Sequence, residues 1–286
     1  FILGAVPTSK NLPILSNNER TEVGKMYKEN GNEAAIEKGY SLVNGKIKDK
    51  RISNWIKFVK KNPQAQMYCA RGGQRSKIAQ NWLKEIGVDI DIVEGGFKAL
   101  RNTCIEVLDS ASSDNKEWII IAGKTGSGKT KMIKQISNSI DLEGLANHRG
   151  SAFGGFETLQ PTPVNFENNL AYQYLNISSN KVFIEDESKT IGRLVIPKKF
   201  FNKMNSSTLV LIKEPIENRI KNIYHEYVSK EIEQTGEHKV LISLRSKLQK
   251  ISKRLGGTNY KIADNLIEDA FQKNDYNIHY EWIKTL

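Results

Sequence analysis

Residues 118–130 read WIIIAGKTGSGKT, and this stretch decides the fold of most of the chain. The apolar run before Gly123 is typical of a buried strand, and the pattern Gly-x4-Gly-Lys-Thr follows it directly. In this pattern the glycines allow backbone N–H groups to surround phosphate oxygens, the lysine neutralises them, and the threonine hydroxyl can bind Mg²⁺. We therefore predict a strand, a phosphate-binding loop and a helix. The predicted phosphate-site residues are Gly123, Gly126, Ser127, Gly128, Lys129 and Thr130.

A second apolar run, residues 181–184, ends in the acids Glu185, Asp186 and Glu187. We predict that it forms a strand beside the first one, with its acids near the phosphate loop. Because Mg²⁺ prefers oxygen ligands, Asp186 together with Thr130 is the expected Mg²⁺ site, and Glu185 is a further candidate for metal binding or acid–base chemistry. An ordinary strand end with solvated acids is the alternative.

Between these strands, residues 141–155 read DLEGLANHRGSAFGG. The run is long for a connection and is rich in glycine, so we predict a substrate loop that faces the phosphate site. Arg149 is the expected clamp on a phosphate or diphosphate. His148 is a candidate general acid or base, with a simple hydrogen-bonded loop residue as the alternative.

A last strand at residues 209–212 completes a P-loop NTPase-like α/β domain predicted at residues 117–214, and residues 215–286 are predicted to form a helical, basic extension. Within it, residues 238–255 place leucines and isoleucines on one helical face and basic residues elsewhere. A basic amphipathic helix beside a phosphate-binding domain favours an RNA backbone over a solvated or membrane-bound surface. The expected tRNA contacts are Arg245, Lys247, Lys250, Lys253 and Arg254.

A second glycine-containing loop lies upstream, where residues 67–76 read MYCARGGQRS. The two glycines let the backbone curl so that N–H groups point inward, and Arg75 opens a segment with helical periodicity. We expect these donors, together with Arg71 and Arg75, to lower the pKa of the Cys69 thiol and make it nucleophilic. Cys69, Arg71 and Arg75 are therefore the candidate catalytic residues, and a buried structural cysteine is the alternative.

Residues 1–108 alternate between predicted helices and short extended runs at residues 66–68 and 88–93. Such alternation predicts a small α/β domain with a parallel sheet, and the cysteine loop follows one of its strands. The polar, serine-rich residues 109–116 are predicted to be a linker.

The composition limits the remaining choices. The 286 residues carry 43 Lys and Arg against 32 Asp and Glu, a net charge of +11 that favours a polyanionic partner. No apolar run of about eighteen residues occurs, so no membrane partner is expected. Two cysteines without metal-ligand spacing fit a reducing compartment, and we expect a cytoplasmic protein.

Several motifs occur in the order and spacing of the bacterial tRNA 2-selenouridine synthase family, which the chain resembles over nearly its whole length. They are Cys69–Ser76, Glu94–Arg101, Gly123–Thr130, Asp141–Gly154 and Glu185–Ser188. The resemblance implies a rhodanese-like domain at residues 1–108, joined to the P-loop domain. The first strand of that family domain has no counterpart, so we expect the first domain to be incomplete at its N-terminus.

The resemblance also implies a substrate and a reaction. The substrate is the wobble 2-thiouridine of tRNA, which is converted to 2-selenouridine through S-geranyl-2-thiouridine, with geranyl diphosphate and selenophosphate as cosubstrates. Cys69 would carry selenium as a perselenide, and Lys129, Thr130 and Arg149 would hold the diphosphate. No tightly bound cofactor is implied, apart from the Mg²⁺ considered above.

Two other functions are open at this stage. One is a nucleotide-coupled tRNA sulfurtransferase or kinase that uses the phosphate loop on ATP or GTP. The other is a tRNA-binding protein without catalysis. A cysteine-dependent phosphatase is a weaker third, since it shares the Cys-x5-Arg spacing but usually places a histidine where Tyr68 stands.

Overall fold

The computed structural model describes residues 3–286. The chain divides into two compact units, with the boundary between Cys104 and Ile105. Each unit has its own hydrophobic core. Among the described residues, none of the helices combines the length and the apolarity that crossing a membrane requires.

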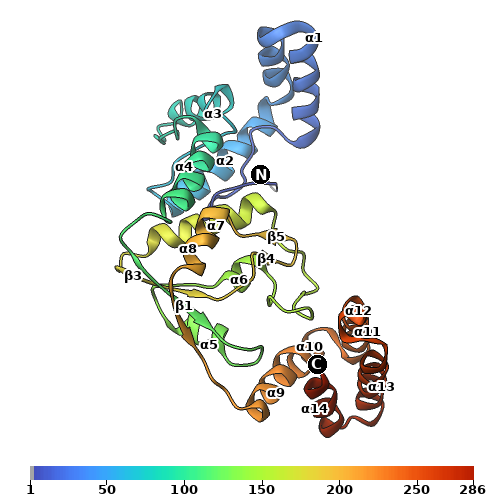
Figure 1. Ribbon diagram of the computed structural model, residues 1–286. Helices are drawn as coiled ribbons and strands as arrows, with labels where there is room; N and C mark the ends of the chain where they lie inside the picture. Colours follow the sequence, from blue (N-terminus) through green and yellow to red (C-terminus); the bar gives the residue numbers. More distant parts are fainter. Residues whose placement is uncertain (1–2) are drawn as a thin grey trace. The chain divides into compact units, whose positions relative to one another are not determined.

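The first unit is mainly helical (Figure 1). Its helices are α1 (Asn17–Leu42), α2 (Gly45–Lys61), α3 (Gln74–Lys84) and the start of α4 (Gly96–Ser110). Helix α1 begins at a capping box formed by Ser16 and Glu19, and its backbone is interrupted by a kink at Gly31, where φ is 85°. The core contains the stacked rings of Trp55 and Trp82, whose centroids lie 6.2 Å apart.

The predicted sheet of the first unit is reduced to one isolated parallel bridge, between Met67 and Ile92. Met67 donates its N–H to the Asp91 carbonyl at 2.7 Å and accepts from the Val93 N–H at 2.9 Å. The predicted parallel direction is confirmed, but the regular strands predicted at residues 66–68 and 88–93 are wrong within the described part of this unit. The turn at Pro63 and the cysteine loop leave too few extended residues around Met67 for a longer ladder.

The second unit contains a four-stranded parallel sheet with the order β2-β3-β1-β6 (Figure 1). The strands are β1 (Glu117–Ala122), β2 (Ser139–Ile140), β3 (Lys181–Glu185) and β6 (Thr208–Leu211). The three strands predicted from apolar runs are confirmed. Strand β1 lies between β3 and β6, with Ile121 opposite both Glu185 and Val210. The chain that leaves β1 therefore emerges at the centre of the sheet's carboxyl edge, where open α/β sheets bind ligands.

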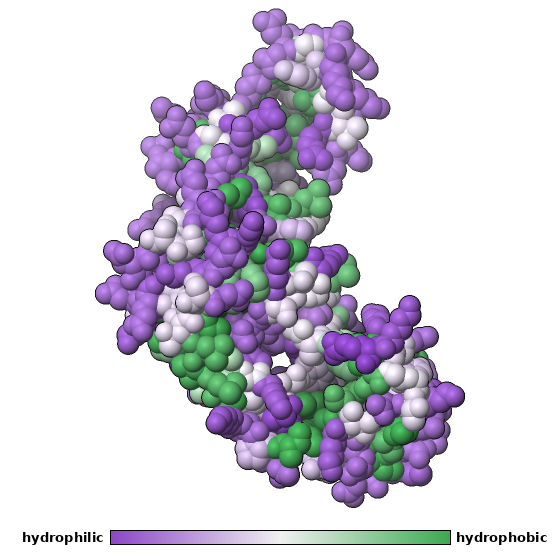
Figure 2. Space-filling view, in the orientation of Figure 1, coloured by the Kyte–Doolittle hydropathy of each residue, from purple (hydrophilic) through white to green (hydrophobic). Residues whose placement is uncertain are grey.

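Short helices surround this sheet, and a two-stranded ribbon adjoins it. The helices are α5 (Lys129–Gln135), α6 (Leu142–Ala146), α7 (Pro163–Asn176) and α8 (Lys198–Asn205), and the ribbon is β4 (Thr190–Ile191) with β5 (Leu194–Val195). The buried side chains of Ile120, Ile184 and Phe166 belong to this core. Strand β6 is different, because Leu209, Val210 and Leu211 are 57%, 45% and 55% exposed. Figure 2 shows hydrophobic surface at this edge of the sheet.

The predicted linker at residues 109–116 is instead part of the second unit. Helix α4 continues to Ser110, and Leu108 and Ala111 are buried. The Tyr174 hydroxyl donates a hydrogen bond to the Asp114 carboxylate. Because apolar side chains within and beside this serine-rich segment are buried, it packs and does not behave as a free tether.

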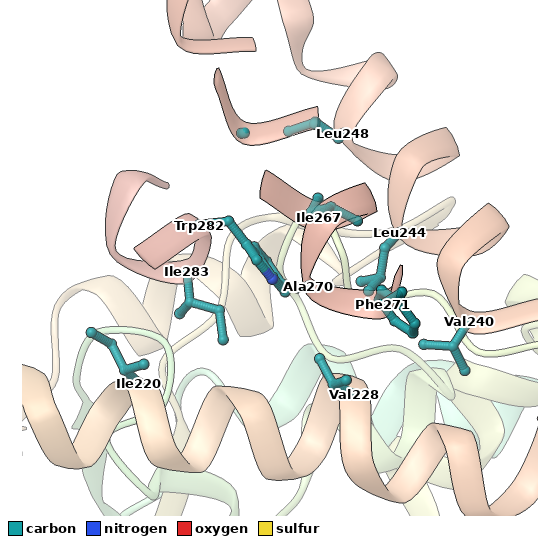
Figure 3. Close-up of a cluster of buried hydrophobic side chains, with 11 residues drawn as sticks. Ile220, Val228, Val240, Leu244, Leu248, Ile267, Ala270, Phe271, Trp282 and Ile283 are labelled. Carbon is teal, nitrogen blue, oxygen red and sulfur yellow. The ribbon is translucent and has the colours of Figure 1, made fainter. Parts of the chain in front are cut away.

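The C-terminal region is a helical bundle, as predicted. It consists of α9 (Ile216–Tyr224), the π-helix η1 (His225–Ser229), α10 (Lys230–Thr235), α11 (Glu237–Lys250), α12 (Ser252–Leu255), α13 (Gly257–Lys273) and α14 (Tyr276–Thr285). Figure 3 shows Trp282, Ile267 and Leu244 meeting Val228 of η1 in its core. The single helix predicted at residues 238–255 is interrupted at Ile251, whose backbone is not helical.

Candidate functional site

The loop between β1 and α5 has the backbone that its glycines predict. Gly126 and Gly128 have φ values of 79° and 85°, in the left-handed region that favours glycine. A Cβ atom at Gly126 would lie 2.5 Å from the Arg219 carbonyl oxygen. Arg219 also donates from Nε to the Thr125 carbonyl at 2.9 Å, and Asn222 donates from Nδ2 to the Gly126 carbonyl at 2.8 Å. Helix α9 therefore holds the loop from outside.

A cavity of about 410 Å³ opens above this loop. Its walls include every residue that we predicted for the phosphate site: Gly123, Gly126, Ser127, Gly128, Lys129, Thr130 and Arg149. Lys129 donates from Nζ to the Gly123 carbonyl at 2.7 Å, which places its ammonium group within the loop. Such a concave arrangement of N–H groups with a lysine suits a di- or triphosphate.

Three glutamates form a carboxylate cluster beside Thr130. Oxygens of Glu143, Glu185 and Glu187 all lie within 4.8 Å of one another. The Thr130 hydroxyl lies 2.8 Å from Glu185 Oε1 and 3.0 Å from Glu143 Oε2. Glu185 is fully buried, and its Oε2 has no hydrogen-bond partner. A buried carboxylate oxygen without a hydrogen-bond partner raises the free energy of the folded protein, and a bound proton or cation at this atom would lower it.

Burial, followed by repulsion within the carboxylate cluster, raises the pKa of all three side chains well above the usual range for glutamate. The carboxylate oxygens of Glu143 and Glu187 lie within 4.8 Å of each other and of Glu185, so a proton or a cation in the cluster would relieve their repulsion. An all-oxygen donor set with a threonine hydroxyl fits Mg²⁺, which would replace these protons.

The structure places Asp186, which we expected beside Thr130, apart from the carboxylate cluster. Asp186 is exposed on the cavity wall and does not belong to the carboxylate cluster. The chain stays extended past β3, since Asp186 donates its N–H to Ile121 at 2.9 Å. Side chains alternate along an extended chain, so Glu185 and Glu187 face one side and Asp186 faces the other.

Glu143 reaches the carboxylate cluster through a short helix in the predicted substrate loop. Asp141 caps α6 by accepting from the Gly144 N–H at 2.7 Å, which places Glu143 in the first helical turn. The first part of residues 141–155 is therefore helical. We did not assign Glu143 a role from the sequence, and the acidic cap before it is the only local signal that could have suggested one.

Arg149 lies on the cavity wall, but its guanidinium group is already engaged. Its Nη2 lies 2.7 Å from Glu231 Oε1, and its Cζ lies 4.3 and 4.8 Å from the ring centres of Phe156 and Tyr227. His148 lies outside the cavity lining and accepts from the Gly150 N–H at Nδ1. Burial, followed by Lys247 and Arg149, lowers the pKa of His148.

The π-helix η1 adds a residue that the sequence did not indicate. It carries Tyr227, which lines the cavity and lies 2.9 Å, hydroxyl to hydroxyl, from Ser151. Burial raises the pKa of Tyr227 to about 12. π-Helices are frequent at functional sites because they re-aim side chains within a helix.

The predicted tRNA-contacting residues have different environments. Arg245 pairs with Asp264 at 2.8 Å and with Glu268 at 3.3 Å, so much of its hydrogen-bonding capacity is used within the bundle. Lys247 is partly buried and donates to the Gly155 carbonyl at 2.7 Å. Lys250, Lys253 and Arg254 are exposed.

In the first unit, the cysteine loop surrounds the Cys69 thiol with polar groups. Its Sγ lies 3.3 Å from the Ser76 hydroxyl. Burial raises the pKa of the thiol, but hydrogen bonds from the Ser76 side chain and from the loop N–H groups outweigh it and lower the pKa to about 7. Arg71 and Arg75 are exposed, and of these two only the Arg71 backbone N–H is among the causes. Ser76, at the start of α3, is the stabilising residue that our reasoning missed.

The start of α4 fixes the shape of the cysteine loop. Phe97 donates its N–H to the Cys69 carbonyl at 2.8 Å, and Lys98 donates to Ala70 at 3.1 Å. Gly96 lies so close that a Cβ atom there would overlap the Cys69 carbonyl oxygen. Two segments separated by about twenty-five positions thus make one site that stabilises a thiolate.

The second unit as a whole is a P-loop α/β domain, defined by a glycine loop after a central parallel strand with a buried carboxylate beside its threonine. Residues 116–286 match the family described as tRNA 2-selenouridine synthase AAA domain. The tRNA 2-selenouridine synthase of Shewanella woodyi is 43% identical over 301 residues, covering 100% of this chain and 82% of the relative. That of Sulfurovum sp. is 42% identical, covering 99% and 80%. The chain belongs to the tRNA 2-selenouridine synthase family. No solved structure matches it significantly.

Proposed function

We propose that this protein is a tRNA-modifying transferase that converts wobble 2-thiouridine to 2-selenouridine through an S-geranyl intermediate. The relatives are named for 2-selenouridine synthesis on tRNA. The observation that carries the proposal is the presence, in one chain, of a thiol with a pKa of about 7 and a phosphate cavity walled by Lys129 and a carboxylate cluster.

In the first stage, the phosphate cavity holds the diphosphate of geranyl diphosphate. The thiouridine sulfur forms a bond to the allylic carbon as the C–O bond breaks, the diphosphate leaves, and the base loses a proton. Charge grows on the leaving oxygens, so the loop N–H groups and Lys129 act mainly on the transition state. Arg149 contributes positive charge at the wall, reduced by its pairing with Glu231.

Mg²⁺ fits this stage. Glu143, Glu185 and Glu187 with the Thr130 hydroxyl would hold the ion, and the buried, unpartnered Glu185 Oε2 is the atom that favours it. The bound ion would neutralise part of the diphosphate charge. Mn²⁺ binding to the full chain, followed by electron paramagnetic resonance, would test this set of ligands without any assay of activity.

In the second stage, water takes the phosphoryl group of selenophosphate as phosphate, the released selenide forms a bond to C2 of the base, and the geranylthio group leaves as geranylthiol. Cys69 would serve this stage by holding the selenium in its loop, where the hydrogen bonds that stabilise the thiolate would also stabilise a selenium anion. The first unit would then serve as a rhodanese-like selenium carrier, and the second as the prenyl-transfer unit.

The test uses the full chain, an anticodon stem-loop RNA that carries 2-thiouridine, geranyl diphosphate and selenophosphate, with nucleoside mass spectrometry. Geranylated nucleoside is expected to accumulate in Cys69→Ser and to be absent in Lys129→Ala. If intact protein forms neither product but hydrolyses ATP, the nucleotide-coupled function replaces the one proposed.

A further inference from the structure

A second cavity of about 200 Å³ adjoins the phosphate cavity, and Arg149 and Tyr227 line both. We call the second cavity the lysine pocket. The residues that matter for its chemistry are Lys239, Lys247, Lys250, Phe156, Val240 and Leu244. They come from α11 and from the end of the glycine-rich loop. The pocket is smaller than a typical cavity for a whole drug-sized ligand, so it suits one small group of a larger molecule.

The charges of the lysine pocket are not balanced by the chain. Three lysines and Arg149 face two acids, Glu231 and Glu157. Glu231 is taken by Arg149 at 2.7 Å. Glu157 lies 3.9 Å from Lys239 with both side chains more than half exposed, and such a pair contributes little. The pocket therefore presents excess positive charge to a ligand.

Lys247 is the most informative of these cations. Its Nζ donates to a neutral group, the Gly155 carbonyl, at 2.7 Å. Burial is the largest cause and lowers the pKa of its amine, the nearby Glu231 carboxylate raises it, and Arg149 and Lys250 lower it further. A desolvated cation with a neutral partner gains more from an incoming anion than an exposed lysine does.

Phe156 gives the pocket an aromatic wall. Its ring is 37% exposed, although the Arg149 guanidinium stacks on it at 4.3 Å. Phosphate groups held by lysines next to an exposed ring are typical of single-stranded RNA recognition, in which bases stack on aromatic side chains.

We infer that the lysine pocket binds a backbone phosphate of the RNA nucleotide next to the base that reacts in the phosphate cavity. The inference rests on the proposed function and deepens it, because it gives the acceptor a place beside the donor diphosphate. The apolar tail of the prenyl donor is the competing occupant. Val240 and Leu244 are compatible with a tail, but Lys247 and Lys250 form no ion pair among the described residues and Lys239 has only the exposed pair with Glu157, so the pocket favours an anion.

The experiment measures the affinity of the full chain for the 2-thiouridine stem-loop by fluorescence anisotropy, and the KM for geranyl diphosphate. The variants are Lys247→Met and Lys250→Met, which keep an unbranched side chain without the charge. Lys261→Met on α13, an exposed lysine outside the pocket, is the matched control. Lys247→Met loses the hydrogen bond to the Gly155 carbonyl, which can disturb the loop. Lys250→Met is the second variant because Lys250 is exposed and its replacement does not affect folding.

Each pocket variant is expected to weaken RNA binding about tenfold and to reduce the dependence of log K on log salt by about 0.7, with an unchanged KM for geranyl diphosphate. The control is expected to change RNA affinity less than twofold. Replacing the phosphates that flank the 2-thiouridine with methylphosphonate, one at a time, should weaken binding to the wild type at one position and have no further effect on Lys247→Met.

A raised KM for geranyl diphosphate with unchanged RNA affinity would assign the pocket to the prenyl tail and overturn the inference. Unchanged values for both ligands would overturn it as well. Failure of the proposed function gives a different result, because the wild type would then form no geranylated nucleoside whatever the pocket variants do to RNA binding.

Discussion

The cysteine loop and the phosphate loop both bind an anion through backbone N–H groups, but different elements of the fold hold the two loops in shape. Each is a glycine-containing turn that leaves an extended segment and opens a helix, and each directs backbone N–H groups toward an anion. The phosphate loop leaves the central strand of a four-stranded sheet, and α9 holds it from outside. The cysteine loop leaves a single bridge, and α4 holds it.

The two loops also differ in where the anion comes from. The phosphate loop receives a charged group from solution, so it adds Lys129 and a carboxylate cluster suited to a counter-ion. The cysteine loop generates its own anion from Cys69, so hydrogen bonds from Ser76 and the backbone are sufficient. The comparison indicates that glycine spacing sets the backbone conformation of a loop. Close contacts with a helix distant in sequence determine which of the glycines leave no room for a Cβ atom.

Replacement of glycines in the phosphate loop is expected to have the largest effect. In Gly126→Ala the new Cβ meets the backbone of α9, whereas in Gly128→Ala it enters open space and strains only φ. Loss of preorganised donors lowers rates by about 10²–10³, so we expect about 100-fold slower geranylation in Gly126→Ala and about tenfold in Gly128→Ala. Product formation followed by mass spectrometry measures both. Equal losses would show that α9 does not hold the loop.

The matching pair in the cysteine loop is Gly96→Ala and Gly73→Ala. A Cβ at Gly96 would overlap backbone atoms of the loop, while one at Gly73 meets nothing within 4 Å. We expect Gly96→Ala to lower the free energy of unfolding of the first unit by about 3 kcal/mol, and Gly73→Ala by less than about 1 kcal/mol. Denaturant unfolding followed by Trp55 and Trp82 fluorescence checks this. Similar values would mean that α4 does not shape the loop.

Ser76→Ala tests the source of thiolate stabilisation. A lost hydrogen bond of about 1.4 kcal/mol raises the pKa of Cys69 by about one unit from its value near 7, and the thiolate fraction at pH 7 then falls about fivefold. Alkylation rates measured against pH in a Cys104→Ser background give the pKa directly. In the same background, Arg75→Ala should leave the profile nearly unchanged, and a larger shift for Arg75→Ala than for Ser76→Ala would restore the original prediction.

The smallest expected effect concerns pH. Because burial raises the pKa of Glu185 in the folded protein above that of a glutamate in the unfolded chain, the folded protein binds more protons than the unfolded chain between these two pKa values. Stability therefore falls as pH rises through this window. In chelator, Glu185→Gln should remove part of that slope and be about 1 kcal/mol more stable than wild type at pH 8.

Mg²⁺ provides the control for this last prediction. Added Mg²⁺ should stabilise the wild type and have a smaller effect on Glu185→Gln, measured by thermal unfolding against pH. A wild-type stability that does not change between pH 5 and pH 8 would contradict the raised pKa values.

Local sequence patterns predicted the elements that depend on local interactions. Strands β1, β3 and β6, the phosphate loop, the helices of the first unit and the helical C-terminal region follow from apolar periodicity and glycine spacing. The sheet of the first unit did not follow, because a ladder depends on partners that an extended run cannot specify. The break at Ile251 was also missed, because the apolar face continues through it.

Side-chain partners were harder to predict than elements. Glu143 joins Glu185 only because Asp141 caps a short helix forty-odd positions earlier, and Asp186 is excluded by strand alternation. Arg245 appeared free on its own helix, but α13 supplies Asp264 and Glu268 to pair with it. For Arg245, the deciding groups lie on another element of the fold, which its own helix cannot reveal.

The exposed edge strand β6 affects the tendency of this protein to self-associate. Leu209, Val210 and Leu211 are each at least 45% exposed along a strand that pairs on one side with β1. An apolar edge of this kind is a template on which other chains can add a strand. Concentrated samples are expected to form β-rich oligomers through this edge, and Val210→Lys should delay them in light scattering.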